Sequence, residues 1–485
     1  MKNYIKILAL GSALALSSCE DLLDTQPKQS LTPATAFADA KGYESLIFAT
    51  YGKLRSFSYY GQTMNIAPDV MADNLRIIAN TGRYIGQETN ADRAHINLWD
   101  FSTVNNFRGV YSGINEANIV LAEIDATEGD QALKDRIKGE AHFLRALFYF
   151  DLARVYGYEP GKEVNGWNQS VVIRTEPVAN FSAADLRTRS TNREVYDLIE
   201  SDLQAAIGLL PAAATGTANV YRASKGAAEA LLSRVFLYDS KFAEAAAMAT
   251  QAMATFNLGN DGTGLLTPEN YVSAFSTFPN PESLFEVEIR SVDWSTVDGV
   301  NNSMASLTSN ALPSAQFILT VSPELYAAYE ENDVRKTAWT ETTRSGATGV
   351  VYRSNKWLGA KGDFLENLPI MRGAELYLIR AEARYRTGDE AGARADLNAL
   401  RSKRGLGAVD AGLTAENLFA QILQERRVEF VLEGHRWFDL KRNGLPIPKS
   451  GSFQTVPYND YRLLAPIPVD QLTLNTELQD NPGYN

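Results

Sequence analysis

The chain has 485 residues, enough for roughly two to four domains or one large fused body. Hydrophobic residues make up 45% and charged residues 21%, which excludes wholesale disorder. Asp and Glu (58) outnumber Lys and Arg (46) without any basic stripe, so we expect no nucleic-acid partner. Cys19 is the only cysteine, which excludes an intrachain disulfide and, with three scattered histidines, a Cys/His zinc cluster. We expect neither a metal ion nor a cofactor.

Residues 1–18 are typical of a lipoprotein signal peptide. Lys2 and Lys6 supply a positive start, and the short apolar stretch over 5–16 is too short to span a membrane. The sequence Leu16-Ser17-Ser18-Cys19 resembles a bacterial lipobox, in which Cys19 becomes the acylated mature N-terminus. An ordinary signal peptide with a chance cysteine is the alternative. We favour the lipoprotein because the sole cysteine falls at the lipobox position, where its acyl chains would anchor the protein firmly.

Helical periodicity dominates the chain that follows. Apolar residues recur every three or four positions over 106–125, 132–156 and 193–210, which predicts three amphipathic helices. Gly157 ends the second of these helices, and Pro211 closes the third.

Residues 224–256 and 370–403 each have the pattern of a helix, a short turn and a second helix. The two segments share Leu, Tyr and Ala positions, with small residues where two helices approach closely. We expect the turns at Asp239-Ser240-Lys241 and Thr387-Gly388-Asp389. This pattern resembles a pair of tetratricopeptide-type units. Because the units lie far apart in sequence, we expect a helical scaffold with large insertions rather than a plain solenoid.

Residues 257–369 are rich in Gly, Asn, Ser, Thr and Pro, with short β-like stretches at 284–289 and 350–352. Such irregular segments on a rigid scaffold are usual places for binding residues. We therefore predict a mainly α protein, with a tetratricopeptide-like helical scaffold and a loop-rich, partly β ligand-binding lobe. The predicted division is an N-terminal helical region, 19–225, and a C-terminal region, 226–485, that contains the insertion.

Residues 421–442 combine alternating acids and bases with apolar residues. Glu425 and Glu429 would lie one helical turn apart, which indicates a partly buried ion-pair ladder that Gly434 would interrupt. Catalysis by Glu425, Glu429 and Glu433 is the alternative. A charge ladder on an amphipathic helix is far more often structural, so we predict no catalytic residue.

Several short motifs follow one another along almost the whole mature chain. They are Cys19-Glu20-Asp21, Tyr111…Ile114…Ala117-Asn118, Glu140-Ala141-His142-Phe143-Leu144-Arg145-Ala146, Ala374-Glu375-Leu376-Tyr377-Leu378, Glu425-Arg426-Arg427, Glu433-Gly434, Arg436-Trp437-Phe438-Asp439-Leu440 and Asn481-Pro482-Gly483-Tyr484. Each motif alone is weakly specific, but their order and joint presence are highly specific. In this combination the chain resembles the SusD/RagB lipoproteins of Bacteroidetes-type outer membranes.

The resemblance implies a protein that is not an enzyme. Such proteins capture a glycan outside the cell and cap a SusC-like TonB-dependent transporter that imports it, and some relatives handle peptides. It therefore implies an oligosaccharide or polysaccharide ligand, a SusC-like partner, and an outer-membrane location facing the cell exterior through the lipid on Cys19. The acidic, aromatic-rich composition independently suits ligand capture.

Sugars are bound by stacking on aromatic rings while polar side chains hydrogen-bond the hydroxyls. Loop-like segments that combine both residue types give the candidate ligand-binding residues Asp73, Asn74, Arg83, Tyr84, Trp99 and Trp294. Asn301 and Asn302 follow Trp294 in the same loop-rich stretch. Both tryptophans could equally anchor loops, and Arg83 and Asp73 could be solvated or paired, since large aromatics are mostly buried.

Two other classes of function stay open. An extracellular glycoside hydrolase needs two carboxylates roughly 5–9.5 Å apart, a spacing that sequence does not reveal. A peptide-binding, RagB-like protein or interaction scaffold would also suit tetratricopeptide-type units. Asn260-Asp261-Gly262 lacks the full calcium-loop signature, so we do not predict bound calcium.

Overall fold

The residues described by the computed structural model are 37–89, 103–180, 182–212 and 217–484. The predicted signal peptide, Cys19 and Trp99 lie outside the described residues. Within the described ranges, no helix is both long and apolar enough to cross a membrane.

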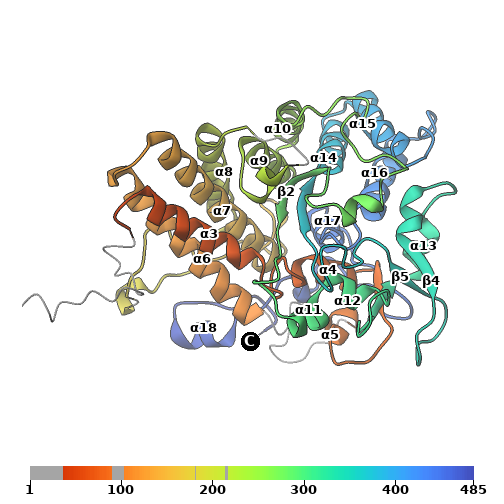
Figure 1. Ribbon diagram of the computed structural model, residues 1–485, viewed down its shortest axis with the longest axis horizontal. Coiled ribbons are helices and arrows are strands. Elements are labelled where there is room, and N and C mark those ends of the chain that lie inside the picture. Colours follow the sequence, from red (N-terminus) through yellow and green to blue (C-terminus); the bar gives the residue numbers. More distant parts are fainter. Residues whose placement is uncertain (1–36, 90–102, 181, 213–216, 485) are drawn as a thin grey trace, which may run out of the picture.

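A row of helices packed side by side forms the larger part of the molecule (Figure 1). Helices pack on one another in the order α7, α8, α9, α10, α14 and α15, while α3 and α6 pack on α7, and α16 packs on α14. Their bounds are α3 (Ala40–Leu54), α6 (Thr103–Glu123), α7 (Gln131–Tyr156), α8 (Asn192–Leu209), α9 (Lys225–Tyr238), α10 (Phe242–Thr255), α14 (Gly373–Arg386), α15 (Glu390–Ser402) and α16 (Ala415–Glu429). The prediction of a mainly α fold is confirmed.

The three amphipathic helices expected from periodicity are α6, α7 and α8, and their ends follow local chemistry. The Asp130 side chain accepts a hydrogen bond from the Leu133 N–H at the start of α7, and Thr191 and Glu194 form a capping box at the start of α8. Gly157 follows the last residue of α7, as the sequence predicts. These caps satisfy N–H groups that a helix start would otherwise leave unpaired.

A motif arginine joins the first three scaffold helices. The Arg145 guanidinium on α7 pairs with the Asp202 carboxylate on α8, at 2.7 Å between Nη2 and Oδ1, and donates to the Asn118 amide oxygen on α6 at 2.8 Å. All three side chains are buried. The polar members of these motifs therefore fix helix packing.

The two predicted helix pairs are α9–α10 and α14–α15, and they lie against each other through α10 and α14. Each pair is joined by a three-residue turn at the predicted position. The middle residues, Ser240 and Gly388, have φ angles of 58° and 86°, in the left-handed region that ends a helix abruptly. Units far apart in the chain thus form one continuous scaffold.

The loop-rich lobe is held by three two-stranded antiparallel sheets. The strands are β1 (Leu75–Ile77), β2 (Ser283–Val287), β3 (Leu319–Val321), β4 (Trp339–Thr342), β5 (Val351–Ser354) and β6 (Leu368–Arg372). Strand β2 pairs with β6, β1 with β3 and β4 with β5. The two β-like stretches expected from sequence correspond to β2 and β5. The short helices that lie between these strands were not expected.

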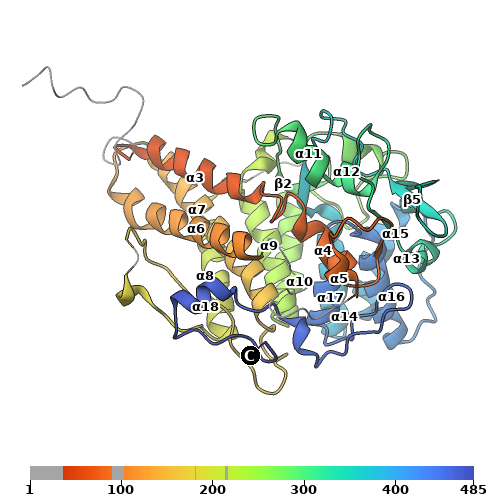
Figure 2. The same cartoon turned by 90° about the horizontal axis from the view of Figure 1, so that it is seen from below.

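The other elements are short. The α-helices among them are α4 (Thr63–Val70), α5 (Ile85–Thr89), α11 (Thr296–Asn302), α12 (Met304–Thr308), α13 (Pro323–Ala328), α17 (Arg436–Arg442) and α18 (Val469–Leu474). The 3-10 turns are Ile124–Ala126, Ala183–Asp185, Ala218–Tyr221, Ser273–Ser276, Val334–Ala338 and Tyr461–Leu463. Helices α4, α5, α11 and α12 lie in the same half of the molecule, away from α18 (Figure 2).

The charged motif forms a buried network across elements. Glu429 at the end of α16 contacts the guanidinium groups of Arg335, Arg372 and Arg404 at 2.8 to 3.2 Å. Glu433 pairs with Arg372 and with the Lys356 ammonium at 2.7 to 2.8 Å. The sequence predicts a ladder along one helix, whereas the partners come from the lobe and from the segment after α15. This motif joins scaffold to lobe.

Candidate functional site

Arg83 and Tyr84 line a hollow beside α4 and α5 with a volume of about 260 Å³. This hollow, the Arg83 cavity, is lined by Gln62, Thr63, Thr81, Gly82, Arg83, Tyr84 and Gln87. Two of the predicted ligand-binding residues therefore face one hollow.

A strained turn presents these two residues. Gly82 and Tyr84 have φ angles of 82° and 60°. The left-handed region costs a residue with a Cβ atom roughly 1–2 kcal/mol, and such strain is concentrated at functional sites. The ring of Tyr84 is buried, and its hydroxyl donates to the Gln62 amide oxygen at 2.8 Å. Burial raises the pKa of Tyr84, so this hydroxyl remains a donor at neutral pH.

Arg83 bridges to the lobe. Its Nη2 lies 3.0 Å from the Asn302 amide oxygen, and its Nη1 donates to the Asn301 carbonyl and lies 3.3 Å from the Gln316 amide oxygen. Gln62 completes the link, because its Nε2 donates to the Asn302 carbonyl at 2.8 Å. The structure thus brings the two predicted segments, around Arg83 and around Asn301, to one place.

Asp73 and Asn74 lie in the interior nearby, where other side chains hold their polar atoms. The Asp73 carboxylate pairs with Arg427 at 2.9 Å and with Arg436 at 2.8 Å. The Asn74 amide accepts from Arg427 at 2.9 Å and donates to Asp69 at 2.7 Å. Both are almost fully buried, at 6% and 1% exposure. These contacts tie the segment after α4 to the charged motif.

Trp294 is a buried anchor in this structure, with 7% of its surface exposed. Its indole N–H donates to the Arg55 carbonyl at 3.2 Å, and the neighbouring Asp293 pairs with the Arg55 guanidinium at 3.0 Å. The ring therefore fixes the loop before α11 against the end of α3. Trp99, the other predicted aromatic, lies outside the described residues.

Sequence reasoning missed Gln62, Gln87 and Lys449, because no motif surrounds them. The Lys449 ammonium is buried and donates to the Met71 carbonyl at 2.6 Å and the Gln87 carbonyl at 2.8 Å. It holds the end of α4 against α5. Burial lowers the pKa of Lys449 to about 7, since nearby carboxylates compensate only part of the desolvation.

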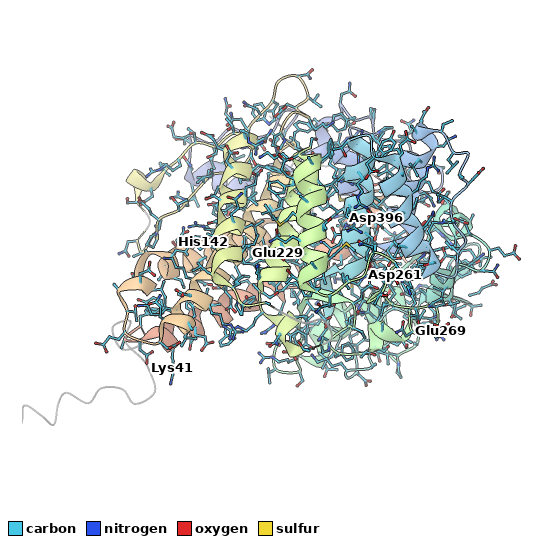
Figure 3. All side chains as sticks on the ribbon, turned by 90° about the horizontal axis from the view of Figure 1, so that it is seen from above. Lys41, His142, Glu229, Asp261, Glu269 and Asp396 are labelled. Atoms are coloured by element: carbon cyan, nitrogen blue, oxygen red, sulfur yellow. The ribbon has the colours of Figure 1, made fainter. Side chains whose placement is uncertain are left out.

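Among the described residues that line the Arg83 cavity, none carries a carboxylate. Elsewhere, titratable side chains such as His142, Glu229 and Asp396 lie on separate scaffold helices (Figure 3). Each has its own partner: Asp202 for His142, Gln251 and Thr255 for Glu229, and Arg380 and Arg384 for Asp396. In the part of the chain that the structure describes, no group of three or more potential metal ligands occurs.

A second hollow, of about 380 Å³, lies between α6 and α18. Its lining combines apolar and aromatic residues with polar ones, among them Phe107, Tyr111, Val172, Leu474, Arg108, Asn115 and Asn475. The predicted ligand-binding residues lie elsewhere, and the Tyr111 hydroxyl is engaged by the Val172 carbonyl at 2.8 Å. The Arg83 cavity is preferred as the candidate site because two of the ligand-binding residues predicted from sequence line it.

Comparison with known proteins agrees with this fold. A family model described as starch-binding and associating with the outer membrane matches residues 23–237, and the SusD family model matches residues 324–484. The SusD-like protein P2 of Formosa agariphila is 25% identical, over 100% of both chains. The starch-binding protein SusD of Bacteroides thetaiotaomicron is 33% identical over 125 residues, 24% of this chain and 22% of that protein.

Solved structures give the same result. A SusD superfamily protein from Bacteroides vulgatus matches with a TM-score of 0.78 and 26% identity, covering 93% of this chain and 100% of that one. A SusD superfamily protein from Bacteroides thetaiotaomicron matches with a TM-score of 0.77 and 25% identity, covering 92% and 100%. Family models and full-length structural matches agree, so this chain belongs to the SusD family of carbohydrate-binding proteins.

Proposed function

We propose that the protein binds an oligosaccharide non-covalently in the Arg83 cavity. The observation that carries this proposal is the meeting of Arg83, Tyr84 and Gln62 with the Asn301–Asn302 segment of α11. Amide, hydroxyl and guanidinium groups supply the donors and acceptors that sugar hydroxyls need. They come from elements that Lys449 and the charged motif hold in place, which limits the entropy lost on binding.

The same site argues for capture without chemistry. Glycoside hydrolysis needs two carboxylates across the scissile bond, and the described lining of the Arg83 cavity offers neither. Burial by itself would raise the pKa of Glu429 and of Glu433. The buried guanidinium groups paired with these acids outweigh that effect and lower both pKa values. Such carboxylates stay ionised and serve packing.

We also propose that Cys19 is acylated and anchors the chain to the outer membrane, facing the cell exterior. There the protein would hand its ligand to a SusC-like TonB-dependent transporter. Support comes from the lipobox sequence, from the resemblance to SusD/RagB lipoproteins, and from the family description as associating with the outer membrane.

Calorimetric titration of the acylated chain in mild detergent, with neutral and acidic oligosaccharides and a peptide mixture, tests ligand capture. Tyr84→Phe removes the hydroxyl that orients Gln62, so we expect its affinity to fall about tenfold. Tyr111→Phe is the matched control, because it removes a hydroxyl at the α6–α18 hollow. We expect its affinity to equal that of the wild type.

The reverse pattern, with weaker binding only in Tyr111→Phe, would place the ligand in the α6–α18 hollow instead. Binding of peptides but of no oligosaccharide would mean that the ligand is a peptide and not a glycan. Release of shortened products from labelled oligosaccharides by the wild-type protein would make it a hydrolase.

A further inference from the structure

The Arg83 guanidinium has only neutral acceptors among the described residues. These are the Asn301 carbonyl and the amide oxygens of Asn302, Gln316 and Gln62, the last at 3.5 Å. Four neutral oxygens position the group, and no described residue brings a carboxylate into an ion pair with it. Arg83 is partly buried, and desolvation lowers its pKa, with the neighbouring Tyr84 as the opposing contribution.

Three fully buried arginines of this chain are paired with carboxylates. Arg335, Arg372 and Arg404 are each fully buried and each lies within 3.3 Å of at least two carboxylates. Proteins pair buried charges in this way because an unpaired charge out of water is costly. Arg83 lacks such pairing among the described residues. The buried Arg189 also donates to four backbone carbonyls and the Asn481 amide oxygen, but Arg83 differs from it by lining a cavity that a ligand can enter.

Two acids on elements beside the cavity, Glu88 on α5 and Asp298 on α11, have other partners. The Glu88 carboxylate accepts from the Ile77 N–H at 2.6 Å, and the Asp298 carboxylate accepts from the Ser295 hydroxyl at 2.6 Å as a helix cap. Asp73 is neutralised by two arginines, as described above. Arg76, on the neighbouring strand β1, also donates only to carbonyl oxygens among the described residues. Neither Glu88 nor Asp298 is therefore among the groups that the Arg83 guanidinium contacts in the described chain.

We infer that the Arg83 cavity selects acidic oligosaccharides, with Arg83 as the counter-charge to a carboxylate or sulfate ester on the sugar. This inference rests on the proposed function, since it names the class of saccharide that the same site binds. An anionic group on the sugar would supply the negative charge that no described residue places next to Arg83. Charge-assisted hydrogen bonds are roughly twice as strong as neutral ones. A neutral sugar would leave the guanidinium charge uncompensated.

The test compares each acidic oligosaccharide with its own neutralised form on the acylated full chain. One arm uses an oligouronate and its methyl ester, the second a sulfated oligosaccharide and its desulfated form, and a third a neutral β-glucan oligosaccharide. We expect the acidic member of at least one pair to bind at least about tenfold more tightly, an advantage that shrinks as ionic strength rises. The arm that shows the advantage tells carboxylate from sulfate.

Variants assign the preference to one residue. Arg83→Gln keeps hydrogen-bonding capacity but removes the charge, and we expect it to bind the acidic and neutralised forms equally. Arg76→Gln is the matched control, since it removes the same charge from β1 outside the cavity lining, and we expect it to keep the preference. Thermal unfolding checks that both variants are folded.

Equal or tighter binding of the neutralised forms by the wild-type protein overturns the acidic selectivity while leaving glycan capture intact. A preference that survives Arg83→Gln in a folded protein also overturns the role of Arg83. Absence of binding to every saccharide overturns the proposed function itself and the inference with it.

Discussion

Asp73 and Arg83 lie ten positions apart in the sequence, yet the charge of Asp73 is paired and that of Arg83 has neutral partners among the described residues. The Asp73 carboxylate meets two guanidinium groups and becomes part of the interior. Among the described residues, the Arg83 guanidinium contacts only amide and carbonyl oxygens, at the edge of a cavity. Residue type alone predicts that both residues bind ligand. The structure distinguishes them, because distant segments of the chain supply each with different partners.

Glu366 provides a residue-scale prediction about pH. Its Oε1 accepts from the Ala305 N–H at 3.0 Å at the start of α12, while its buried Oε2 has no partner in the described chain. Desolvation raises its pKa from 4.5 to about 7. Because the folded pKa lies above the unfolded one, the stability from this group is full below about pH 4.5 and is lost as pH rises to about 7.

Glu366→Gln cannot ionise and escapes that loss. We expect the variant to gain stability relative to the wild type between pH 4.5 and pH 8, by on the order of 2–3 kcal/mol. Chemical denaturation at both pH values measures the gain. Asp69, whose pKa burial also raises to about 7, titrates in both proteins and cancels in the difference.

The exposed Glu331→Gln is the control, and its stability difference from the wild type should stay flat over the same range. A flat difference for Glu366→Gln as well would mean that Glu366 is ionised at little cost in the folded protein.

At the scale of elements, the end of α16 connects the helical scaffold to the loop-rich lobe. Glu429 is surrounded by three arginines, and the chain then turns sharply, with Gly434 at a φ of 79°. A Cβ atom on Gly434 would lie 2.1 Å from the Met64 carbonyl of α4, so only glycine fits this approach. The charged motif and the helix beside the Arg83 cavity are therefore in direct contact.

Glu429→Gln should be strongly destabilising, because it leaves three buried guanidinium groups short of one negative charge. We expect a loss of about 3–5 kcal/mol in the free energy of unfolding, measured by denaturant titration. Lys138→Met, which breaks the more exposed pair with Asp125, should cost less than about 1 kcal/mol. A similar small cost at Glu429 would show that the network contributes little to folding.

At the scale of the molecule, the Arg83 cavity depends on segments from both ends of the chain. Strand β1 pairs with β3, the loop before α11 is anchored on α3, and Lys449 braces α4 and α5. The first and last parts of the chain therefore build the lobe together. The predicted division into residues 19–225 and 226–485 stays a prediction.

A transporter partner is also a whole-molecule prediction. A stable complex needs roughly 1,000 Å² or more of buried surface, so we expect the acylated protein to co-purify with a β-barrel transporter from its native membrane in mild detergent. A Cys19→Ser variant that lacks the anchor is the control for membrane attachment. Recovery of the wild-type protein only as a free monomer would contradict a stable complex.

The sequence determined the helical scaffold, because three-and-four periodicity with local caps and breakers specifies α6 to α10 and α14 to α16 from residues close together in the chain. It also nominated Arg83 and Tyr84 through their chemistry. Tertiary structure alone decided that Asp73, Asn74 and Trp294 are engaged in the interior and that Arg83 has neutral acceptors among the described residues. Burial and pairing depend on contacts between segments hundreds of residues apart, which no local pattern records.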